Sequence, residues 1–291
     1  MKGRKEMLNF SKYHGCGNNF VMVKEHELLE YLALGNDADL EGNEYPAFAQ
    51  KACDINTGIG ADGLIIVREE PQLEMVFYNM DGSRAPMCGN GIRCFAYFCQ
   101  EEGIREELSY VVKTLAGDMI VEVTSREPFM ARINMGRPIY EPAAIAVKSE
   151  RSDFMKQVLE ISDGSKWTVN SLFMGTVHTV VFVDDYDSFD IEYVGKELCE
   201  HPAYTEKTNV NFVKVIDENT VEMKTYERGV GMTLACGTGA CATAVVADMQ
   251  GLCNSPVEVI LQLGSLNIEL EDDGSVFMEG PSVKIAKGTL V

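Results

Sequence analysis

The sequence predicts an α+β protein made of two copies of one domain, each mostly antiparallel strands around one or two helices. The first observation is an internal repeat: residues 78–91, YNMDGSRAPMCGNG, match residues 226–239, YERGVGMTLACGTG. The match holds a constant offset of 148 positions, so Cys88 and Cys236 are counterparts. The second observation is that strand-like apolar runs precede this motif in both copies, and an apolar helix-like run follows it.

Composition limits the classes of partner. A chain of 291 residues, 46% of them hydrophobic, is long enough for two domains with separate cores. Its formal net charge of −20 repels phosphate backbones and anionic lipid, so we expect no nucleic acid and no membrane partner. The start, MKGRKEMLNF, lacks the apolar run of a signal peptide. Nine cysteines without a C-x-x-C pair favour a reducing cytoplasmic setting over disulfides or a metal site.

The first elements of each copy are expected to be strands. Residues 8–23 contain a glycine-rich turn followed by the β-forming run FVMV. Residues 168–183 are their counterpart at an offset of 160, with VVFV as the matching run. In this register the matched pairs are His14-Gly15 with Met174-Gly175 and Asn18 with His178.

Residues 25–53 have helical patterning that is interrupted by the glycine-containing segment 35–42. The segment that follows, 58–63, spells G-x-G-x-x-G. In a dinucleotide site these glycines follow a strand and open a helix, whereas here they precede the apolar run 64–67. The order is wrong for that function, and we do not assign a dinucleotide site.

Each cysteine turn is followed by a segment that is apolar around most of its circumference, residues 92–100 and 240–250. Such a helix is buried, so we expect one central helix in each copy. Gly103 and Gly251 follow as C-terminal stops.

Strands with turns at Gly117 and Gly264 come next, and each copy ends on a strand, 131–135 or 276–278. Residues 142–167 are polar and have no counterpart in the repeat. We expect them to hold the link between the two halves.

The paired cysteines point to proton chemistry. A cysteine just before a helix lies beside unsatisfied N–H groups and the positive end of the helix dipole, which favours thiolate. Small residues after Cys88 and Cys236 let a ligand approach those amides, and two facing helix N-termini would bind a carboxylate. One thiolate could then remove the α-proton of a bound amino acid while the other thiol protonates the opposite face. That reaction is racemisation by two bases.

An amino-acid α-proton is far less acidic than a thiol, so donors directed at the carboxylate must stabilise the carbanion-like state in a dry pocket. The sequence shows no sign of a pyridoxal Schiff-base lysine, and we expect cofactor-free chemistry. Single buried cysteines are usually structural. We assign that role to Cys16, Cys53, Cys94, Cys99, Cys199, Cys241 and Cys253.

At these residues the sequence resembles the diaminopimelate epimerase family, whose members use two thiols and no cofactor. The resemblance covers nearly the whole chain. The matching stretches are FSKYHGCGNNF (10–20), GIGADGL (58–64), NMDGSRAPMCGNGIRCF (79–95), TNVNF (208–212) and YERGVGMTLACGTGACA (226–242).

The resemblance implies two pseudo-symmetric domains, each a barrel-like sheet around a central helix, with substrate in the cleft between them. It also implies that the last strand returns to the first domain. The expected domains are therefore 1–134 plus 282–291, and 135–281.

The resemblance also implies roles for individual residues. Cys88 and Cys236 would be the acid/base pair, and His178 and Glu227 would set the protonation of the cysteines. The remaining expected substrate-binding residues fall into three groups: Gly89, Asn90, Gly237 and Thr238 for the reacting carboxylate, Asn18 and Glu227 for the reacting amino group, and Asn79, Thr176, Asn209 and Arg228 for the distal end.

Departures from the family pattern concern mainly the distal end. Thr176 and Val177 replace asparagine and proline, and Asn19 and Met232 replace acidic residues. The first hypothesis is an epimerase that interconverts LL- and meso-diaminopimelate for lysine and peptidoglycan precursors. The alternative is a racemase for another amino acid on the same scaffold. In either case we expect a small-molecule amino-acid substrate, and a homodimer is compatible with the sequence.

Three further alternatives are weaker. Proline racemases usually carry histidine after the first Cys-Gly, where Asn90 stands here. Phenazine-type isomerases of this fold lack the paired cysteines. A nucleotide-binding or redox-sensing protein would use the G-x-G-x-x-G segment or a reversible bond between Cys88 and Cys236, and the glycine context argues against the former.

Overall fold

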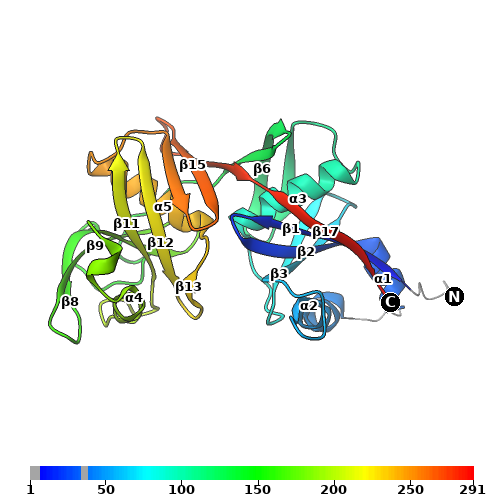
Figure 1. The fold of residues 1–291 in the computed structure, drawn as a ribbon, viewed down its shortest axis with the longest axis horizontal. Helices are drawn as coiled ribbons and strands as arrows, with labels where there is room; N and C mark the ends of the chain where they lie inside the picture. Colours follow the sequence, from blue (N-terminus) through cyan, green and yellow to red (C-terminus); the bar gives the residue numbers. More distant parts are fainter. Residues whose placement is uncertain (1–6, 34–38) are drawn as a thin grey trace. The chain divides into compact units, whose positions relative to one another are not determined.

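The computed structural model describes residues 7–33 and 39–291. The chain divides into two compact units, unit 1 (Met1–Ile133 and Gly280–Val291) and unit 2 (Asn134–Glu279). The domain limits expected from sequence, 134/135 and 281/282, lie within two residues of these divisions and stay a prediction. Strands dominate both units (Figure 1), so the α+β class is confirmed.

Unit 1 contains a central helix, two outer helices and a continuous run of paired strands. Its elements are β1 (Leu8–Gly15), β2 (Asn18–Lys24), α1 (Glu25–Leu32), η1 (Leu40–Glu44), α2 (Tyr45–Cys53), β3 (Gly63–Arg68), β4 (Glu74–Asn79), α3 (Gly89–Glu101), β5 (Ser109–Thr114), β6 (Gly117–Arg126), β7 (Phe129–Asn134) and β17 (Val283–Leu290). The strands pair in the order β17-β1-β2-β3-β4-β5-β6-β7, with β2–β3 and β4–β5 parallel and the rest antiparallel. The chain's last strand therefore lies along its first (Figure 1).

Unit 2 repeats this plan. Its elements are β8 (Phe154–Glu160), β9 (Lys166–Phe173), β10 (Val177–Phe182), η2 (Tyr186–Ser188), α4 (Ile191–Cys199), β11 (Asn209–Asp217), β12 (Thr220–Glu227), β13 (Gly231–Thr233), α5 (Gly237–Met249), β14 (Val257–Leu261), β15 (Gly264–Leu270) and β16 (Val276–Pro281). The order is β8-β9-β10-β11-β12-β14-β15-β16, with β10–β11 and β12–β14 parallel. Order and direction match unit 1, and β8, which precedes β9 in sequence, holds the position that β17 holds beside β1.

The register of the parallel pair is the same in both units. Phe20 pairs with Gly63 in unit 1, and their counterparts Val180 and Asn211 pair in unit 2. The bridge between Tyr78 and Arg84 likewise matches the pairing of Tyr226 with Met232. The repeat thus extends to individual hydrogen-bonded pairs.

The first hairpins differ, which corrects one expectation. In β1–β2, Gly15 pairs with Asn18 across a two-residue turn, Cys16-Gly17, and both turn residues have positive φ, as a type I′ turn requires. In β9–β10, Phe173 pairs with Val177 across a three-residue turn. The longer turn displaces the preceding strand, so matching His14-Gly15 with Met174-Gly175 was wrong.

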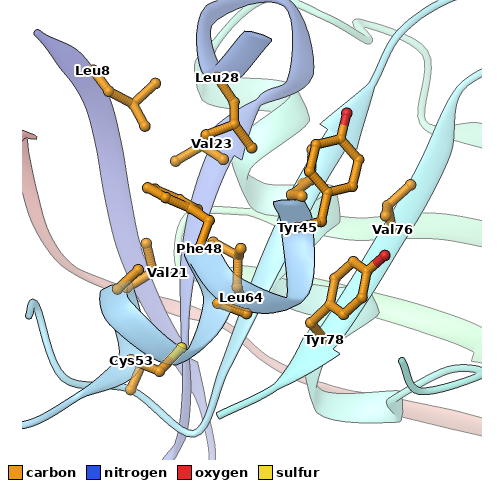
Figure 2. Packing of buried hydrophobic residues seen from close by; sticks show 14 residues of the cluster. Leu8, Val21, Val23, Leu28, Tyr45, Phe48, Cys53, Leu64, Val76 and Tyr78 are labelled. Carbon is orange, nitrogen blue, oxygen red and sulfur yellow. The ribbon is translucent and has the colours of Figure 1, made fainter. Parts of the chain in front are cut away.

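Helices α1 and α2 cover the outer face of the unit 1 strands (Figure 2). Phe48 and Cys53 of α2 pack with Leu64 of β3 and Tyr78 of β4 in one buried cluster. The opposite side of β3 faces α3, where Ile65 approaches the helix. With helices on both faces, β3 is buried along its length, which explains its unbroken apolar sequence. In unit 2, α4 packs on β11 and β12 in the same way.

The central helices α3 and α5 start three residues earlier than the sequence predicted. Both have 13 residues. Helix α3 contacts β1, β2, β3 and β6, whereas α5 contacts β9, β10, β11, β12, β14 and β15. Both end alike: Gly103 and Gly251 have φ of 67° and 68°. Two residues beyond each C-cap, Ile104 N–H donates to Cys99 O and Leu252 N–H donates to Ala247 O. The predicted glycine stops are confirmed.

The region 142–167 is not a link. It contains β8, and the side chains of Ile145, Val147 and Phe154 are buried in the core of unit 2. The chain crosses between units at 133/134 and 279/280 instead. The segment appeared polar because its few core-facing apolar residues alternate with exposed charged ones, as they do on a strand packed on one face.

Two expectations fall partly outside the described residues, namely the start of the chain (1–6) and the helix interruption at 35–42. Within residues 7–33 and 39–291, no helix is long and apolar enough to span a membrane.

Candidate active site

Cys88 is the residue that precedes α3, with an extended backbone (φ −140°, ψ 120°). Its carbonyl oxygen accepts the first helical bond, from Ile92 N–H at 2.9 Å. The amides of the next three residues therefore have no acceptor within the helix and remain available to a ligand. Gly91 fits here because an added Cβ would lie 3.2 Å from Ile65 Cδ1.

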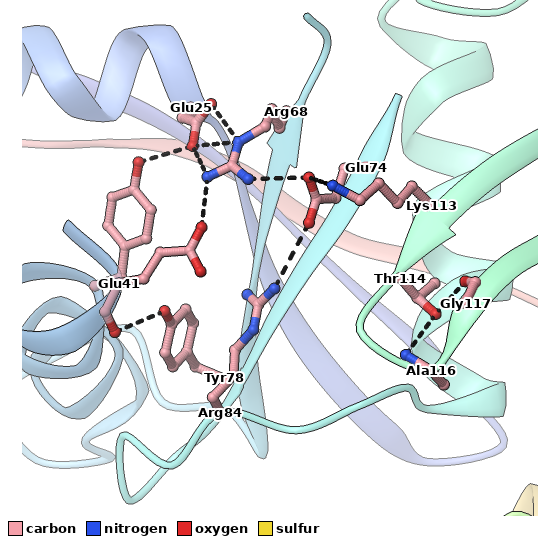
Figure 3. Close-up of polar contacts among 11 residues, drawn as sticks. Glu25, Glu41, Arg68, Glu74, Tyr78, Arg84, Lys113, Thr114, Ala116 and Gly117 are labelled. Atoms are coloured by element: carbon pink, nitrogen blue, oxygen red, sulfur yellow. Dashed lines mark hydrogen bonds and ion pairs between the residues drawn. The ribbon is translucent and has the colours of Figure 1, made fainter. Parts of the chain in front are cut away.

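An ion-pair network fixes the loop that leads to Cys88 (Figure 3). Arg68 of β3 bonds Glu25 of α1 and Glu74 of β4, and Arg84 of the loop lies 3.8 Å from the Glu74 carboxylate. Burial alone would raise the pKa of Glu74, but the hydrogen bonds from Arg68 and Lys113 outweigh it and lower that pKa. On the other side of the loop, Ala116 N–H donates to Pro86 O. The loop is held from two directions.

Side chains around Cys88 form a chain of hydrogen bonds within unit 1. Arg93, which is fully buried, donates to Asn90 Oδ1 at 2.9 Å, and Asn90 Nδ2 approaches Asn18 Oδ1 at 3.4 Å. Cys88 Sγ lies 3.6 Å from the same Asn18 oxygen. Asn18 Nδ2 in turn donates to Asp62 Oδ2 at 2.9 Å. The structure thus brings Cys88, Asn90 and Asn18 together, and the roles expected for them stay a prediction.

Cys236 occupies the same position before α5 as Cys88 does before α3. Its backbone is also extended (φ −132°, ψ 108°), and Ala240 N–H donates to its carbonyl at 2.9 Å. Packing is tighter at this helix start, because a Cβ on Gly239 would come within 2.5 Å of Asn211 Oδ1. Glycine is required there for the helix to lie against Asn211.

His178 connects this helix start to the strands behind it. The ring is fully buried on β10; Asn211 Nδ2 lies 3.1 Å from its Nδ1, and Thr238 Oγ1 lies 2.9 Å from its Nε2. Thr238 Oγ1 is 3.5 Å from Cys236 Sγ. Burial, and secondarily the charge of Arg228, lower the pKa of His178 to about 3. His178, as a neutral imidazole, is therefore connected to Cys236 through Thr238.

Glu227 at the end of β12 also faces Cys236. Thr233 donates a 2.6 Å hydrogen bond to Glu227 Oε1. Burial raises the pKa of Glu227, and hydrogen bonds from Thr233 and Cys236 offset only part of that rise. A carboxyl group held nearer to neutral pH can exchange a proton with its surroundings in the range where an enzyme works.

The expected distal-end residues are divided between the units. In unit 2, Arg228 donates through its backbone to Asn209 Oδ1 at 2.9 Å and through its guanidinium to Thr176 Oγ1 at 3.3 Å. In unit 1, Asn79 donates to Ser83 Oγ at 2.9 Å. Thr176, which departs from the family pattern, still orients the arginine.

All nine cysteines, which lie within the described ranges, are thiols rather than disulfides. Burial raises the pKa of Cys53 and Cys94 to about 12, which keeps both protonated. Among residues 7–33 and 39–291, no cluster of three or more His, Cys, Asp or Glu side chains could hold a metal ion.

Sequence reasoning gave no role to Asp62, Arg93 or Asn211, although all three lie in motifs that carry the resemblance. Their contacts reach the cysteines through other residues: one for Asp62, and two each for Arg93 and Asn211. Their types alone therefore carry no catalytic pattern. A signal existed for Asn211: it is a polar residue in the middle of an apolar strand, where burial demands a partner.

Solved structures with this fold define its class. A phenazine biosynthesis protein of the PhzF family from Bacillus anthracis superposes with a TM-score of 0.65 at 14% identity, covering 99% of this chain and 100% of its own. A hydroxyproline epimerase from Agrobacterium vitis gives 0.66 at 12% identity, over 98% and 93%. The fold is therefore the one that these two proteins share.

Sequence comparison is more specific. The diaminopimelate epimerase family model matches residues 10–141 and 171–285. A diaminopimelate epimerase from Alkaliphilus metalliredigens is 38% identical over 97% of this chain and 96% of its own length, and one from Clostridium perfringens is 39% identical over 97% and 99%. The chain belongs to the diaminopimelate epimerase family, and the predicted resemblance is confirmed.

Proposed function

We propose that this protein is a cofactor-independent isomerase that interconverts LL- and meso-diaminopimelate, within lysine and peptidoglycan precursor synthesis. The observation that carries the proposal is the pair of cysteines, Cys88 and Cys236, each capping a central helix at the same position of a repeated unit. The choice of diaminopimelate as the substrate comes from the full-length relatives that are named diaminopimelate epimerase.

In the proposed mechanism one cysteine removes the α-proton as thiolate and the other delivers a proton to the opposite face as thiol. This requires the two units to bring both sulfurs to one α-carbon. The first-turn amides of α3 and α5 bind the carboxylate and stabilise the charge that develops on it. Asn18 and Glu227 hold the amino group, and His178 and Glu227 set the protonation of Cys236.

For the distal end of the substrate we propose Arg228, Asn79, Asn209 and Thr176. A guanidinium binds a carboxylate bidentately, and diaminopimelate carries a second carboxylate at its far end. The contact of Thr176 with Arg228 supports diaminopimelate over a different amino acid as the substrate. Thr176 departs from the family pattern, yet it still accepts a hydrogen bond from the Arg228 guanidinium. We place the enzyme in the cytoplasm, with a small-molecule amino-acid substrate, no nucleic-acid or membrane partner, and a homodimeric assembly.

The test is α-proton exchange in deuterated water with a panel of amino acids that includes the diaminopimelate stereoisomers. We expect deuterium at the α-carbon of LL- and meso-diaminopimelate without added pyridoxal phosphate. Exchange that favours another amino acid over diaminopimelate, or that needs a cofactor, contradicts the proposal.

The two-base geometry has a separate test. If both sulfurs reach one carbon, mild oxidation should join Cys88 to Cys236 and stop the reaction, and reduction should restore it. Peptide mass mapping would identify the bond. Full activity in a protein that carries this bond would refute the arrangement.

A further inference from the structure

Both reactive sulfurs lie at the N-termini of helices of the same length, 13 residues. The helix dipole therefore favours thiolate equally at both. A difference in their protonation then comes from the side chains that face them. Each sulfur has a hydrogen-bond partner in its own unit, and the partner accepts at one sulfur but donates at the other.

In unit 1, Arg93 at one end and Asp62 at the other determine which groups donate and which accept. Arg93 can only donate, so Asn90 presents its oxygen to Arg93 and its Nδ2 to Asn18. Asp62 accepts from Asn18 Nδ2 and also from Asn19 N–H at 2.7 Å. Asn18 must then present its oxygen toward Cys88.

An amide oxygen accepts hydrogen bonds and cannot donate. The contact between Asn18 Oδ1 and Cys88 Sγ, at 3.6 Å, therefore stabilises the protonated thiol and opposes the thiolate.

In unit 2 the direction is reversed at the sulfur. A neutral imidazole has one donor and one acceptor, and Asn211 Nδ2 occupies the acceptor of His178, Nδ1. Thr225 holds that amide by donating to Asn211 Oδ1 at 3.1 Å. The proton of His178 is thus on Nε2 and points to Thr238 Oγ1, which leaves the Thr238 hydroxyl proton for Cys236. A hydroxyl that donates to sulfur stabilises the thiolate.

We propose that the substrate-free enzyme rests with the thiolate on Cys236 and the thiol on Cys88, and that Asp62 and Asn211 are positioning residues that maintain this difference. For its catalytic meaning this rests on the proposed function: the resting enzyme begins with Cys236 as base. The isomer whose α-proton faces Cys236 can then react at once, whereas the other needs a proton exchange first.

Charged and titratable groups also surround each sulfur. Glu227 faces Cys236 from β12 and shares a hydrogen bond with it. In its carboxylate form Glu227 would accept from the Cys236 thiol and oppose the thiolate there. Its pKa is raised by burial, which favours the neutral acid and weakens that opposition. Arg228 acts on His178. Around Cys88, besides Arg93 and Asp62, the buried thiol of Cys94 is a neighbour.

The experiment is alkylation of the substrate-free protein with iodoacetamide from pH 5 to 10, with the rate at each cysteine followed by peptide mass mapping. We expect a lower pH midpoint for Cys236 than for Cys88, although Cys236 is the more buried of the two. The midpoint, unlike the rate itself, does not depend on exposure. An equal midpoint, or a lower one for Cys88, overturns the proposal.

Matched variants test the hydrogen bonds that lead from Asn211 to Cys236 in unit 2. Thr238→Val should raise the Cys236 midpoint by about one pH unit, since one hydrogen bond to the thiolate is lost, while Thr238→Ser keeps it. Asn211→Asp should also raise it, and ¹⁵N NMR should show the His178 proton moved from Nε2 to Nδ1. The Thr238→Val shift should persist with Glu227→Gln in the background. Equal shifts for valine and serine, or an unmoved His178 proton, contradict this part.

Asp62, whose side chain is exposed, gives the matched pair in unit 1. Asp62→Asn and Asp62→Ala both remove the charge, but only alanine removes the acceptor that orients Asn18. We expect a lower Cys88 midpoint in the alanine variant than in the asparagine variant, and equal midpoints would refute the role of Asp62. Since no substrate is present, these midpoints stand or fall independently of epimerase activity.

Discussion

At the scale of single residues, the two capping cysteines differ from the other seven mainly by position. Cys236 is buried, at 7% exposed, yet it caps a helix and faces Thr238 and Glu227. Cys241, five residues further along the chain, is fully buried inside α5. Burial alone would have classed the two together.

Replacing either capping cysteine should remove one of the two proton-transfer groups. We expect Cys88→Ala and Cys236→Ala each to slow interconversion by at least about a thousandfold, in the range typical for loss of a positioned acid or base. The assay is interconversion of LL- and meso-diaminopimelate followed by chiral chromatography.

Cys241→Ala is the matched control, because it removes a thiol from the same helix without touching the capping position. It should retain activity near that of the parent. Near-parental activity in either capping variant would rule out the two-base scheme.

The neutral state of His178 predicts how stability depends on pH. The pKa of His178 is lowered from its ordinary value of about 6.5 to about 3, so between these values the unfolded chain binds a proton that the folded chain does not. Stability therefore falls as pH decreases through this window, by about 1.4 kcal/mol per pH unit from this group. His178→Gln should lose that slope.

Urea unfolding between pH 4 and 7 would measure this pH slope of stability. Fluorescence of Trp167, the sole tryptophan of the chain, monitors the unfolding and reports on unit 2. His26→Gln is the control, since the His26 side chain is 62% exposed. The prediction fails if His178→Gln unfolds with the same pH slope as the parent.

At the scale of elements, the sequence predicted the central helices and their glycine stops because these features are local. The apolar circumference and the positive φ after the last turn are properties of contiguous residues. The first turn of each helix was missed because its glycines and small polar residues lack a helical pattern. Only the tertiary position of the strands, which forces the backbone close, explains why that turn is helical.

The starts of the two helices should respond differently to an added methyl group. A Cβ on Gly239 would lie 2.5 Å from Asn211 Oδ1, whereas one on Gly91 would meet Ile65 Cδ1 at 3.2 Å and Cys88 Cβ at 3.3 Å. We expect Gly239→Ala to displace Asn211, at a cost of about 1–3 kcal/mol typical of overpacking, and to reduce activity.

Gly91→Ala is the matched variant at the counterpart position and should cost less, because the end of the Ile65 side chain can move. Chemical unfolding followed by circular dichroism compares the two. A larger loss of stability in Gly91→Ala than in Gly239→Ala would contradict this account.

At the scale of the whole molecule, the repeat made the architecture predictable. A shared offset over strand, turn and helix is strong information about a fold. The same offset relates the pairing of Tyr226 with Met232 to that of Tyr78 with Arg84. The turn lengths of the first hairpins could not be predicted, because hydrogen-bond register depends on backbone geometry that an alignment of residues does not contain. Strand β8 was not predicted because the first copy has no counterpart at that place in the sequence. The strand that pairs in the equivalent position is β17.

The position of β17 predicts an unequal response to truncation. Deleting residues 283–291 removes β17, one of the two antiparallel partners of β1, and with it the ion pairs of Lys284 with Glu101 and Lys287 with Glu102. We expect backbone amides of unit 1 to exchange rapidly with deuterium while unit 2 keeps its protection, as measured by hydrogen-exchange mass spectrometry.

The double variant Lys284→Gln, Lys287→Gln separates the two causes. It removes the ion pairs but keeps the strand, and surface pairs of this kind contribute little, about 0–1 kcal/mol each. It should therefore leave exchange nearly unchanged. Full protection of unit 1 in the truncated protein would show that β17 is dispensable.

The same strand sets the order in which the protein can be finished on the ribosome. Multidomain chains generally fold from the N-terminus as they emerge, but unit 1 needs residues 280–291, which are synthesised after unit 2. Unit 2, although its synthesis begins later, therefore has its strands available before unit 1 does. The N-terminal half must stay incomplete until β17 has been made to complete it.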